Sequence, residues 1–593
     1  DFDKLPIPYR AVATDMLTGS MVVLDSGDLA TAMRASMAIP GAFAPVETDK
    51  YVLSDGGMVR NIPVDVARNL CADVVIVVNL VEQELKRDKL QTATQLVMRS
   101  SDVGIMANEN LQLESLTDRD IRIDVIMGDI TTADFERVPE TIPLGEKAAR
   151  GVADKLAPLA VPAAQYQAWR SAVTEGQAIE AKLAAVEFKG LQRVNPEYLE
   201  TRSEVHAGDT VDTAKISAEA QRMSVLPEFE SVSYTLTGDP ANPTLEWWPK
   251  EKSFGPNYLK FDLGLYASEG GDLGFVIYGK HTRTWLNSLG AEWRNEVQIG
   301  YYNNLSTSLY QPLDAAQRFF VEPRAFYVRS WEDVFLDNER LATYRFSDGG
   351  GSIDLGANLS DDAQIRIGYL YTQRRADVET GSQLLPNTKR NDAGLTVSAT
   401  LDSRDTPFNP TQGMAAALEY VYSDESLGAD LDWERIELGL GLAVPVRKDV
   451  VWVTLAGGSD LDSDLPPDRT FMLGGPGSFP GFELGELRVT DYWTASGSYL
   501  WKIKDIMSIR GQALYAGVRL TAGQTFGRLE EYVDPGFDED DMIYGGSLYI
   551  AGRTQAGPLT VGLATTSADS WSLWIAVGRP IGNGTILERG IFR

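Results

Sequence analysis

Apolar and polar residues alternate along the C-terminal half of the chain, from about residue 254 to about residue 581. The first run places apolar side chains at Leu259, Phe261, Leu263 and Leu265. The same alternation recurs in residues 353–357, 365–369 and 395–401. Period-two strands rich in Tyr and Trp are typical of a transmembrane β-barrel, although a soluble all-β sandwich gives similar alternation. Allowing roughly 20 residues for a strand and its connection, this length predicts about 16 antiparallel strands.

The N-terminal part of the chain has a different pattern, because residues 1–155 mix short apolar runs with amphipathic segments, as layered α/β domains do. The apolar run 74–79 predicts a fully buried strand, and residues 91–114 predict a helix. A further helix is expected from residue 143 to about residue 185, interrupted between Pro158 and Pro162. We interpret residues 156–185 as a helical connector.

Residues 186–252 change character again. A strand with a glycine turn is expected over 186–194, and a helix over 212–223. Two more strands are expected over 229–234 and 244–248. The resulting β-α-β-β order predicts a small α+β domain. The whole chain is therefore expected to be multidomain: a partial α/β domain, this small α+β domain, and the barrel.

Composition excludes several classes of function. The 593 residues carry a formal net charge of −30, which argues against a nucleic-acid partner. No cluster of Cys and His with the spacing of metal ligands is present, so we expect neither a metal nor a cofactor. Cys71 is the single cysteine and is expected to lie in the core beside the apolar strand. No apolar stretch approaches the roughly 20 residues that a transmembrane helix needs.

The tripeptide Asp55-Gly56-Gly57 is the candidate site. A β-like apolar run ends in a carboxylate at a glycine turn, and a helix-like segment follows. Glycines let the backbone approach a reacting group closely, and a carboxylate there can orient and deprotonate a hydroxyl. A lone Asp-Gly-Gly is also a common surface turn. The surrounding sequence decides between these two interpretations.

Two neighbouring segments carry a family resemblance, Ala35-Ser-Met-Ala-Ile-Pro-Gly-Ala-Phe-Ala-Pro45 and Asn61-Ile-Pro-Val64. Together with the tripeptide they resemble the C-terminal part of the patatin-like phospholipase domain, over about residues 6–155. The resemblance implies that Asp55 is the proton acceptor of a Ser-Asp dyad, with Gly56 and Gly57 supporting the motif. Arg60 and Asn61 are expected to support the turn. His206 and His281, the two histidines, lie outside this region, so no Ser-His-Asp triad is expected.

The nucleophile of that family lies in Gly-x-Ser-x-Gly. No serine of this sequence has glycine both two residues before it and two residues after it. The glycine-rich oxyanion loop is also missing. We therefore expect that the N-terminal third of the hydrolase is missing from the chain, which begins at Asp1, and that these 593 residues are catalytically inactive. A degenerate hydrolase is the alternative.

Residues 186–252 resemble one polypeptide-transport-associated (POTRA) domain. In the barrel region, residues 401–413 resemble a strand-turn signature of the bacterial surface antigen superfamily, and residues 471–482 resemble its lumen-inserted loop. That loop usually carries an Arg that meets a barrel Asp. Here Pro480 stands in place of the Arg, and Tyr515 in the nearest match to the Asp. Loss of both charges together avoids an unpaired charge and indicates a barrel with a relaxed transport mechanism.

The order of these parts resembles the patatin-like phospholipase autotransporters, a fused subtype of type V secretion. The implied domains are the hydrolase part (1–155), the connector (156–185), the POTRA-like domain (186–252) and the barrel (254–593). The resemblance implies a phospholipase A type of lipid acyl hydrolase in the outer membrane of a Gram-negative bacterium, with the POTRA-like domain in the periplasm. The implied partners are membrane phospholipids, the barrel assembly machinery and a second copy of the chain. The alternative is a barrel assembly or protein secretion factor with a vestigial hydrolase region.

Overall fold

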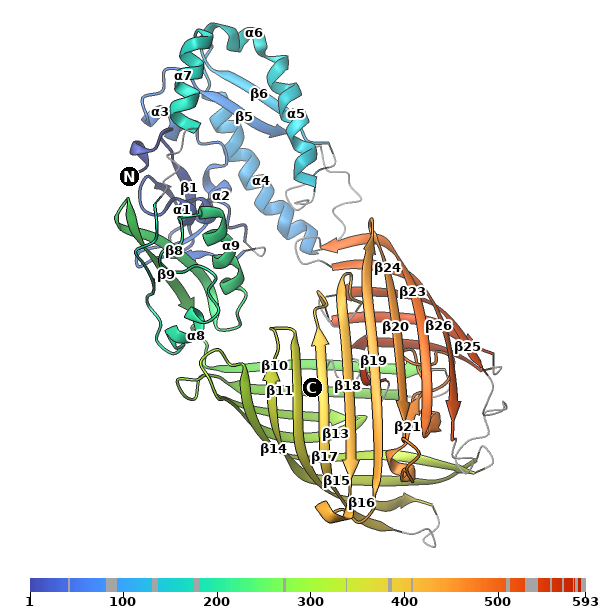
Figure 1. Ribbon diagram of the computed structural model, residues 1–593. Helices are drawn as coiled ribbons and strands as arrows, with labels where there is room; N and C mark the ends of the chain where they lie inside the picture. Colours follow the sequence, from blue (N-terminus) through green and yellow to red (C-terminus); the bar gives the residue numbers. More distant parts are fainter. Residues whose placement is uncertain are drawn as a thin grey trace. The chain divides into compact units, whose positions relative to one another are not determined.

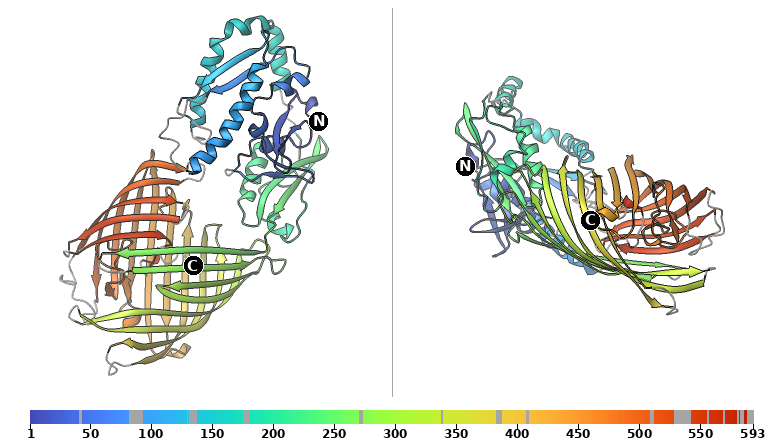
Figure 2. Two further views of the ribbon diagram at one scale, coloured as in Figure 1. Left: turned by 180° about the vertical axis from the view of Figure 1, so that it is seen from behind. Right: turned by 60° about the horizontal axis from the view of Figure 1, so that its bottom comes forward.

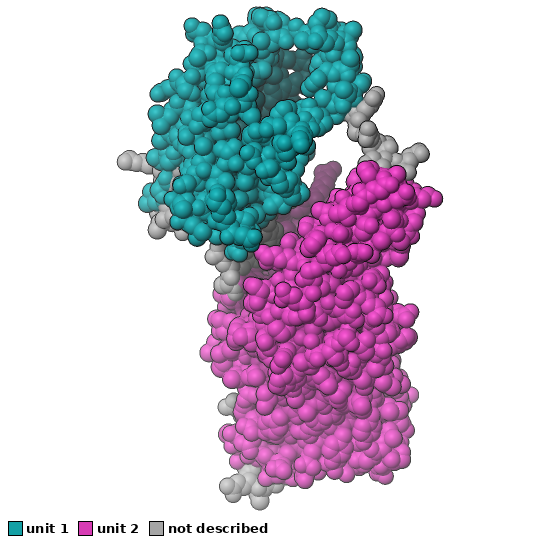
Figure 3. All heavy atoms as spheres, turned by 90° about the vertical axis from the view of Figure 1, so that its left-hand side faces the viewer, with its two compact units in different colours: residues 1–178, 508–511 teal, residues 179–507, 512–593 magenta. Residues whose placement is uncertain are grey.

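The computed structural model divides the chain into two compact units, which Figure 3 colours separately: residues 1–178 with 508–511, and residues 179–507 with 512–593. The structure describes residues 1–40, 43–81, 93–128, 130, 137–174, 181–269, 273–336, 339–381, 387–406, 409–507, 512–527, 542–554, 557–567, 570–579, 581 and 585–587. Figure 1 labels the helices and strands of both units.

The first unit contains two separate sheets. One is four-stranded with the order β2-β1-β4-β3. Its strands are β1 (Ala11–Asp15), β2 (Ser20–Leu24), β3 (Val46–Glu47) and β4 (Val52–Asp55). All five residues of β1 are buried, so this strand forms the centre of the sheet. Helix α1 (Leu29–Ser36) packs against it and is capped by Asp28, whose carboxylate accepts from the Thr31 N–H at 2.7 Å.

The second sheet pairs β5 (Ile76–Val81) in parallel with β6 (Ile121–Ile126). The connecting helix α4 (Ala93–Glu114) agrees with the helix expected over 91–114. Helices α5 (Val138–Gly151) and α6 (Ala153–Leu156) pack on β6. A short 3-10 turn (Ala157–Leu159) and α7 (Ala163–Thr174) follow, so the expected interruption near Pro158 and Pro162 is present. Two short helices, α2 (Gly57–Arg60) and α3 (Val64–Asn69), connect the two sheets.

Two expectations for this unit are wrong. The strand near residues 74–79 is not fully buried, because Ile76, Val78 and Leu80 are 48%, 59% and 56% exposed. The helices that cover β6 do not extend over this face of β5. Cys71 is exposed rather than part of the core. It lies in a tight turn after α3 with a φ of 62°, and its N–H donates to the Arg68 carbonyl, so the chain turns before the strand begins.

The second unit begins with a small mixed sheet of order β7-β9-β8. Its elements are β7 (Ala185–Phe188), α8 (Pro196–Glu200), α9 (Thr213–Ser224), β8 (Phe229–Asp239) and β9 (Asn242–Glu251). Apart from the additional short helix α8, this is the β-α-β-β order expected for residues 186–252. Leu199, Leu245 and Trp247 are fully buried and form the centre of its core.

The rest of this unit is a closed antiparallel barrel of 16 strands, as the alternation predicts (Figure 2). The strands are β10 (Asn257–Ser268), β11 (Leu273–Arg283), β12 (Glu292–Gly300), β13 (Tyr302–Pro312), β14 (Phe319–Leu336), β15 (Glu339–Asn358), β16 (Ala363–Thr380), β17 (Thr388–Asp402), β18 (Gly413–Ser423), β19 (Trp433–Val446), β20 (Asp449–Ser459), β23 (Asp491–Met507), β24 (Gln512–Phe526), β25 (Ile543–Thr554), β26 (Gly557–Thr566) and β27 (Trp571–Gly578). Leu259, Phe261, Leu263 and Leu265 are 67%, 74%, 52% and 45% exposed, which places the apolar series on the outside of the barrel. Strands β27 and β10 close the barrel.

Between β20 and β23 the chain folds into the barrel instead of making a simple turn. This segment contains the two-stranded ribbon of β21 (Phe471–Leu473) and β22 (Leu487–Val489). Phe479 and Phe482, at its tip, are 0% and 2% exposed. Residues 471–482 therefore form a lumen-inserted loop, as their resemblance implies. Among the helices that the structure describes, none is both long and apolar enough to span a bilayer.

Candidate active site around Asp55

Asp55 is the last residue of β4, at the point where this strand turns into α2. Pairing with β1 places Asp55 opposite Ala13 and Ser54 opposite Thr14. The backbone of Asp55 is held on both sides: its N–H donates to the Ala38 carbonyl at 3.0 Å, and its carbonyl accepts from the Thr14 hydroxyl at 2.7 Å. The carboxylate therefore projects from a rigid backbone position.

Gly56 is required by a close approach of two backbone segments. A Cβ at this position would lie 2.0 Å from the carbonyl oxygen of Val12, so the turn can pass over β1 only if residue 56 lacks a side chain. A Cβ on Gly57 would lie 2.8 Å from Oδ1 of Asn61 and 3.0 Å from Oδ1 of Asp55. The structure gives both glycines a physical reason that supports their expected role.

The Asp55 carboxylate is half-buried, and its Oδ1 accepts a hydrogen bond from the Gly57 N–H at 2.7 Å. Burial raises the pKa of this carboxyl, and the Gly57 hydrogen bond offsets only part of that rise. A carboxylate with a raised pKa is a better proton acceptor than an ordinary surface Asp. Across the part of the chain that the structure describes, the Gly57 N–H is the one hydrogen-bond partner recorded for this carboxylate.

Arg60 and Asn61 hold the turn rather than the carboxylate. Arg60 forms an ion pair with Asp65 at 3.2 Å, and Asn61 donates to Glu109 of α4. Asn108, also on α4, donates to the carbonyl of Val59. These contacts join α2 to α4 and fix the direction in which the chain leaves Asp55. His206 and His281 belong to the second unit.

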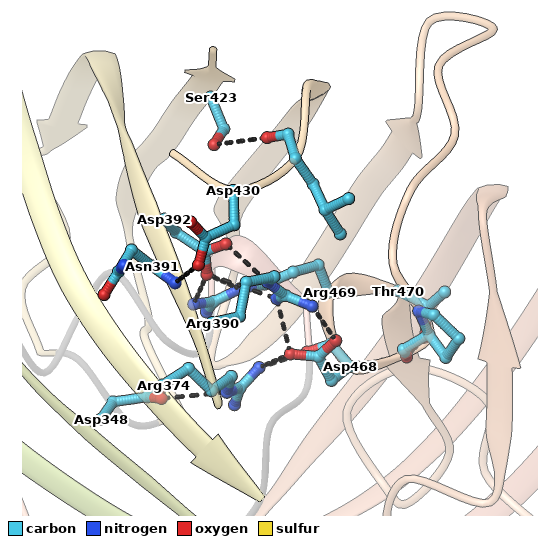
Figure 4. A network of polar contacts seen from close by, with 12 residues as sticks. Asp348, Arg374, Arg390, Asn391, Asp392, Ser423, Asp430, Asp468, Arg469 and Thr470 are labelled. Atoms are coloured by element: carbon cyan, nitrogen blue, oxygen red, sulfur yellow. Dashed lines mark hydrogen bonds and ion pairs between the residues drawn. The ribbon is translucent and has the colours of Figure 1, made fainter. Parts of the chain in front are cut away.

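The lumen of the barrel contains a second group of polar residues, which the sequence did not predict (Figure 4). Asp468, in the segment before β21, accepts from Arg374 of β16 at 2.5 Å and from Arg390 of β17 at 2.8 Å. Arg374 also pairs with Asp348 of β15 at 2.9 Å. Arg390 and Arg469 both pair with Asp392. Three arginines and three aspartates thus fasten the lumen segment to strands β15–β17.

The contacts of the lumen loop show where Pro480 and Tyr515 lie. Tyr515 packs with Ala443, Val450 and Leu500, and the Pro480 carbonyl lies near Gly545 of β25. Arg519 of β24 contacts the loop and donates to the carbonyls of Pro476 at 2.9 Å and Gly477 at 2.6 Å. The charge therefore lies on the barrel wall instead of the loop. Alternation along β24 offered a signal, since residues 515 and 519 share a face.

Among the described residues, no group of three or more His, Cys, Asp or Glu is arranged to hold a metal ion. The Asp55 site offers a half-buried carboxylate with a raised pKa at a glycine turn.

Comparison with known proteins identifies both regions. Residues 6–68 match the patatin-like phospholipase family, and residues 287–516 match the Omp85 superfamily domain. An uncharacterized NTE family protein of Mycobacterium tuberculosis is 47% identical over 78 residues, which are 13% of this chain and 22% of that protein. Patatin-like phospholipase domain-containing protein 7 of Mus musculus is 39% identical over 80 residues, 13% of this chain and 6% of that protein. The chain thus spans less than a quarter of these relatives.

A solved structure supports the barrel. BamA from Haemophilus ducreyi lacking POTRA domains 1–3 aligns with a TM-score of 0.51 at 13% identity, covering 67% of this chain and 84% of that one. This likeness shows a shared fold. The chain thus combines a patatin-like region, which contains Asp55, Gly56 and Gly57, with an Omp85-type barrel of 16 strands. The patatin-like and barrel parts of the resemblance are confirmed.

Proposed function

We propose that the protein is a lipid acyl hydrolase anchored in the outer membrane by its own barrel, with Asp55 as the proton acceptor of a Ser-Asp dyad. One observation carries this proposal. Asp55 ends β4 at a turn where Gly56 cannot accept a side chain, inside the segment that matches the patatin-like phospholipases. The carboxylate uses one oxygen to fix the turn and keeps a raised pKa.

The serine of this dyad is not among the 593 residues, because none of them lies in Gly-x-Ser-x-Gly. In the proposed reaction the serine oxygen attacks the ester carbonyl of a phospholipid while Asp55 accepts the hydroxyl proton. The tetrahedral intermediate collapses to an acyl-enzyme, and Asp55 returns the proton to the leaving alcohol. Water then hydrolyses the acyl-enzyme by the same route. Backbone N–H groups of a glycine-rich loop, also outside these residues, would hold the oxyanion.

The exposed face of β5 supports an incomplete hydrolase core. Ile76, Val78 and Leu80 share a face with Ile121 and Ile123 of β6, since β5 and β6 pair in that register. The β6 residues are buried under α5 and α6, whereas the three β5 residues are exposed. An apolar row on a strand is ordinarily covered by another layer. We infer that a further segment of the hydrolase, with the serine, covers it.

The barrel, residues 254–593, would be the anchor, and barrels of the Omp85 type are outer-membrane proteins. We propose that residues 186–252 form a POTRA-like domain on the periplasmic side and that residues 156–185 connect it to the hydrolase part, residues 1–155. Insertion of the barrel into the membrane would depend on the barrel assembly machinery. Phospholipids of the surrounding membrane would be the substrates of the hydrolase. Assembly into a homo-oligomer is compatible with this arrangement.

The decisive experiment uses a longer chain that carries a Gly-x-Ser-x-Gly segment ahead of Asp1, reconstituted with a chromogenic ester. Asp55→Asn keeps the shape and the hydrogen bond from Gly57 but cannot accept a proton. Loss of a general base costs roughly 10²–10⁴-fold in rate, so we expect kcat to fall by that factor. Asp73→Asn is the matched control, because Asp73 is an exposed aspartate of the same region.

The chain of 593 residues should give background turnover and no labelling by a fluorophosphonate. Covalent labelling of one of its serines would contradict the proposed source of the nucleophile. Near-normal turnover of the Asp55→Asn protein would show that Asp55 is a turn residue, and the hydrolase mechanism would be wrong. If the longer chain is inactive but its deletion impairs barrel assembly or secretion, the alternative function stands instead.

A further inference from the structure

The outer surface of strands β10–β13 becomes polar near the barrel end at which β10 begins. Odd-numbered residues of these strands face outward, and in the middle of the barrel they are exposed and apolar, as at Phe261 (74%), Val297 (43%) and Leu305 (59%). One row nearer the end, His281, Asn295 and Thr307 face outward on β11, β12 and β13, beside Leu259 of β10. They lie directly opposite one another across β11, β12 and β13. A lipid-facing surface has little reason to place three polar side chains side by side.

These side chains form a continuous chain of hydrogen bonds. The Trp293 indole donates to Thr307 Oγ1 at 2.9 Å, and Thr307 Oγ1 donates to Asn295 Oδ1 at 2.9 Å. Asn295 Nδ2 lies 3.2 Å from His281 Nδ1, and His281 Nε2 lies 3.2 Å from Asn257 Oδ1. With the His281 proton on Nε2, each of the four contacts joins one donor to one acceptor. Every donor then points along the series in the direction from Trp293 to Asn257. Such chains strengthen cooperatively and hold their members in place.

Arg283 is next to this chain. Strand pairing places it opposite Asn257 on one side and Trp293 on the other. The Arg283 side chain is exposed, and across the part of the chain that the structure describes it has no recorded ion-pair partner. The outward, odd-numbered positions of β10–β13 include no Asp or Glu, although the protein carries a net charge of −30. The surface around Arg283 is therefore locally suited to an anion.

Three rows of outward residues follow one another along these strands. Successive outward residues on a strand are about 7 Å apart, so an apolar row, a polar row and the Arg283 row follow one another over about 14 Å. Trp293 is exposed at 45% in the last row, and its ring makes a T-shaped contact with the His281 ring, with centroids 5.9 Å apart and an interplanar angle of 89°. Trp on the outside of a barrel marks the level of the lipid headgroups.

We propose that this surface is a binding site for the phosphate of a glycerophospholipid. The Arg283 guanidinium and the Asn257 amide would donate to the phosphate oxygens, and an acyl chain would lie along Phe261, Val297 and Leu305. The hydrogen-bonded chain from Trp293 to Asn257 keeps the amide and the indole in position. The site lies on the outer wall of the barrel, and it stands or falls independently of the proposed hydrolase.

The test is native mass spectrometry of the full chain in detergent, titrated with dioleoyl phosphatidylglycerol. We expect one phospholipid to bind more tightly than the rest, and Arg283→Gln to weaken that binding about 5- to 10-fold, as loss of one basic contact to a phosphate does. Asn295→Leu interrupts the hydrogen-bonded chain at its centre and should weaken the same binding about 2- to 5-fold. Dioleoylglycerol, which has the same acyl chains without phosphate, should not bind at this site.

Arg447→Gln is the matched control. Arg447 is an exposed arginine in the turn between β19 and β20, at the same end of the barrel. The Arg447→Gln protein should bind phosphatidylglycerol as tightly as the unchanged protein does. Equal binding by the Arg283→Gln protein, or equal binding of dioleoylglycerol, would overturn the proposal. Displacement of the bound lipid by millimolar inorganic phosphate would assign the site to a free anion and overturn its assignment to a lipid.

Discussion

The carboxylates of Asp55 and Asp468 are both withdrawn from solvent, but they differ in whether oppositely charged side chains surround them. Asp468 meets two arginines, and the neighbouring arginines and aspartates of the lumen pair with one another, so this chain supplies every charge in the cluster. Asp55 has the Gly57 N–H and no countercharge recorded among the described residues. A fully paired network fixes a structure, whereas a carboxylate with an open side is available for chemistry. The lumen cluster is thus neutralised from within the barrel, whereas the described residues offer no charge partner to Asp55.

Removing one charge from the closed network should have the largest effect. Asp468→Asn keeps the size of the side chain but leaves Arg374 and Arg390 in the lumen without their shared carboxylate. Breaking a buried ion-pair network in this way costs about 3–5 kcal/mol, so the barrel should unfold at a clearly lower temperature. The temperature at which the folded band disappears in gel electrophoresis measures this change.

The control for Asp468 is Asp377→Asn. Asp377 pairs with Arg345 at 3.3 Å, but both side chains are about one third exposed and Arg345 has a second partner in Glu379. Such a pair contributes about 0–1 kcal/mol. Equal effects of the two substitutions would mean that the lumen network does not stabilise the barrel.

The turn beneath the open carboxylate can be tested by one methyl group. In Gly56→Ala the new Cβ would meet the Val12 carbonyl at 2.0 Å, so β4 or α2 must move. We expect a loss of about 1–3 kcal/mol in the stability of the first unit, measured by pulse proteolysis in urea. Gly145→Ala is the opposite case, because its Cβ meets nothing within 4 Å inside α5. That substitution should stabilise the unit by up to about 1 kcal/mol.

The sequence predicted those features that depend on residues close together in the chain. Alternation with period two gave the barrel and its 16 strands, because each strand has one face toward lipid and one toward the lumen. The motif around Asp55 was predicted because its strand, turn and helix lie within a few residues. The Asp468 network was missed because its partners Arg390 and Arg374 are 78 and 94 residues away in the sequence. The exposure of Val78 could not be predicted either, because the sequence of an apolar strand does not show which of its faces a helix will cover.

The smallest expected effect is on the pH dependence of folding stability, which should differ between a carboxylate without a charge partner and one that is held by several hydrogen bonds. Because burial raises the pKa of Asp55, its contribution to stability is fully present below the unfolded-state pKa of about 3.9 and is lost as pH rises through the folded-state pKa. Asp55→Asn cannot ionise, so it should match the unchanged protein near pH 3 and exceed its stability at pH 7 by less than about 1 kcal/mol. Calorimetry of the first unit at both pH values measures the difference.

Asp120 should show the opposite sign in the same experiment. Burial opposes its ionisation, but hydrogen bonds from the Thr117 and Val75 N–H groups, the Thr117 hydroxyl and Arg68 outweigh burial and hold the pKa of this carboxyl well below its usual range. Its contribution to stability is therefore present above the unfolded-state pKa and is lost as pH falls through the folded-state pKa. Asp120→Asn should be less stable than the unchanged protein at pH 7, with a gap that narrows toward pH 3. If both substitutions changed stability in the same direction at pH 7, Asp55 would be a structural carboxylate like Asp120, and its open side would have no chemical meaning.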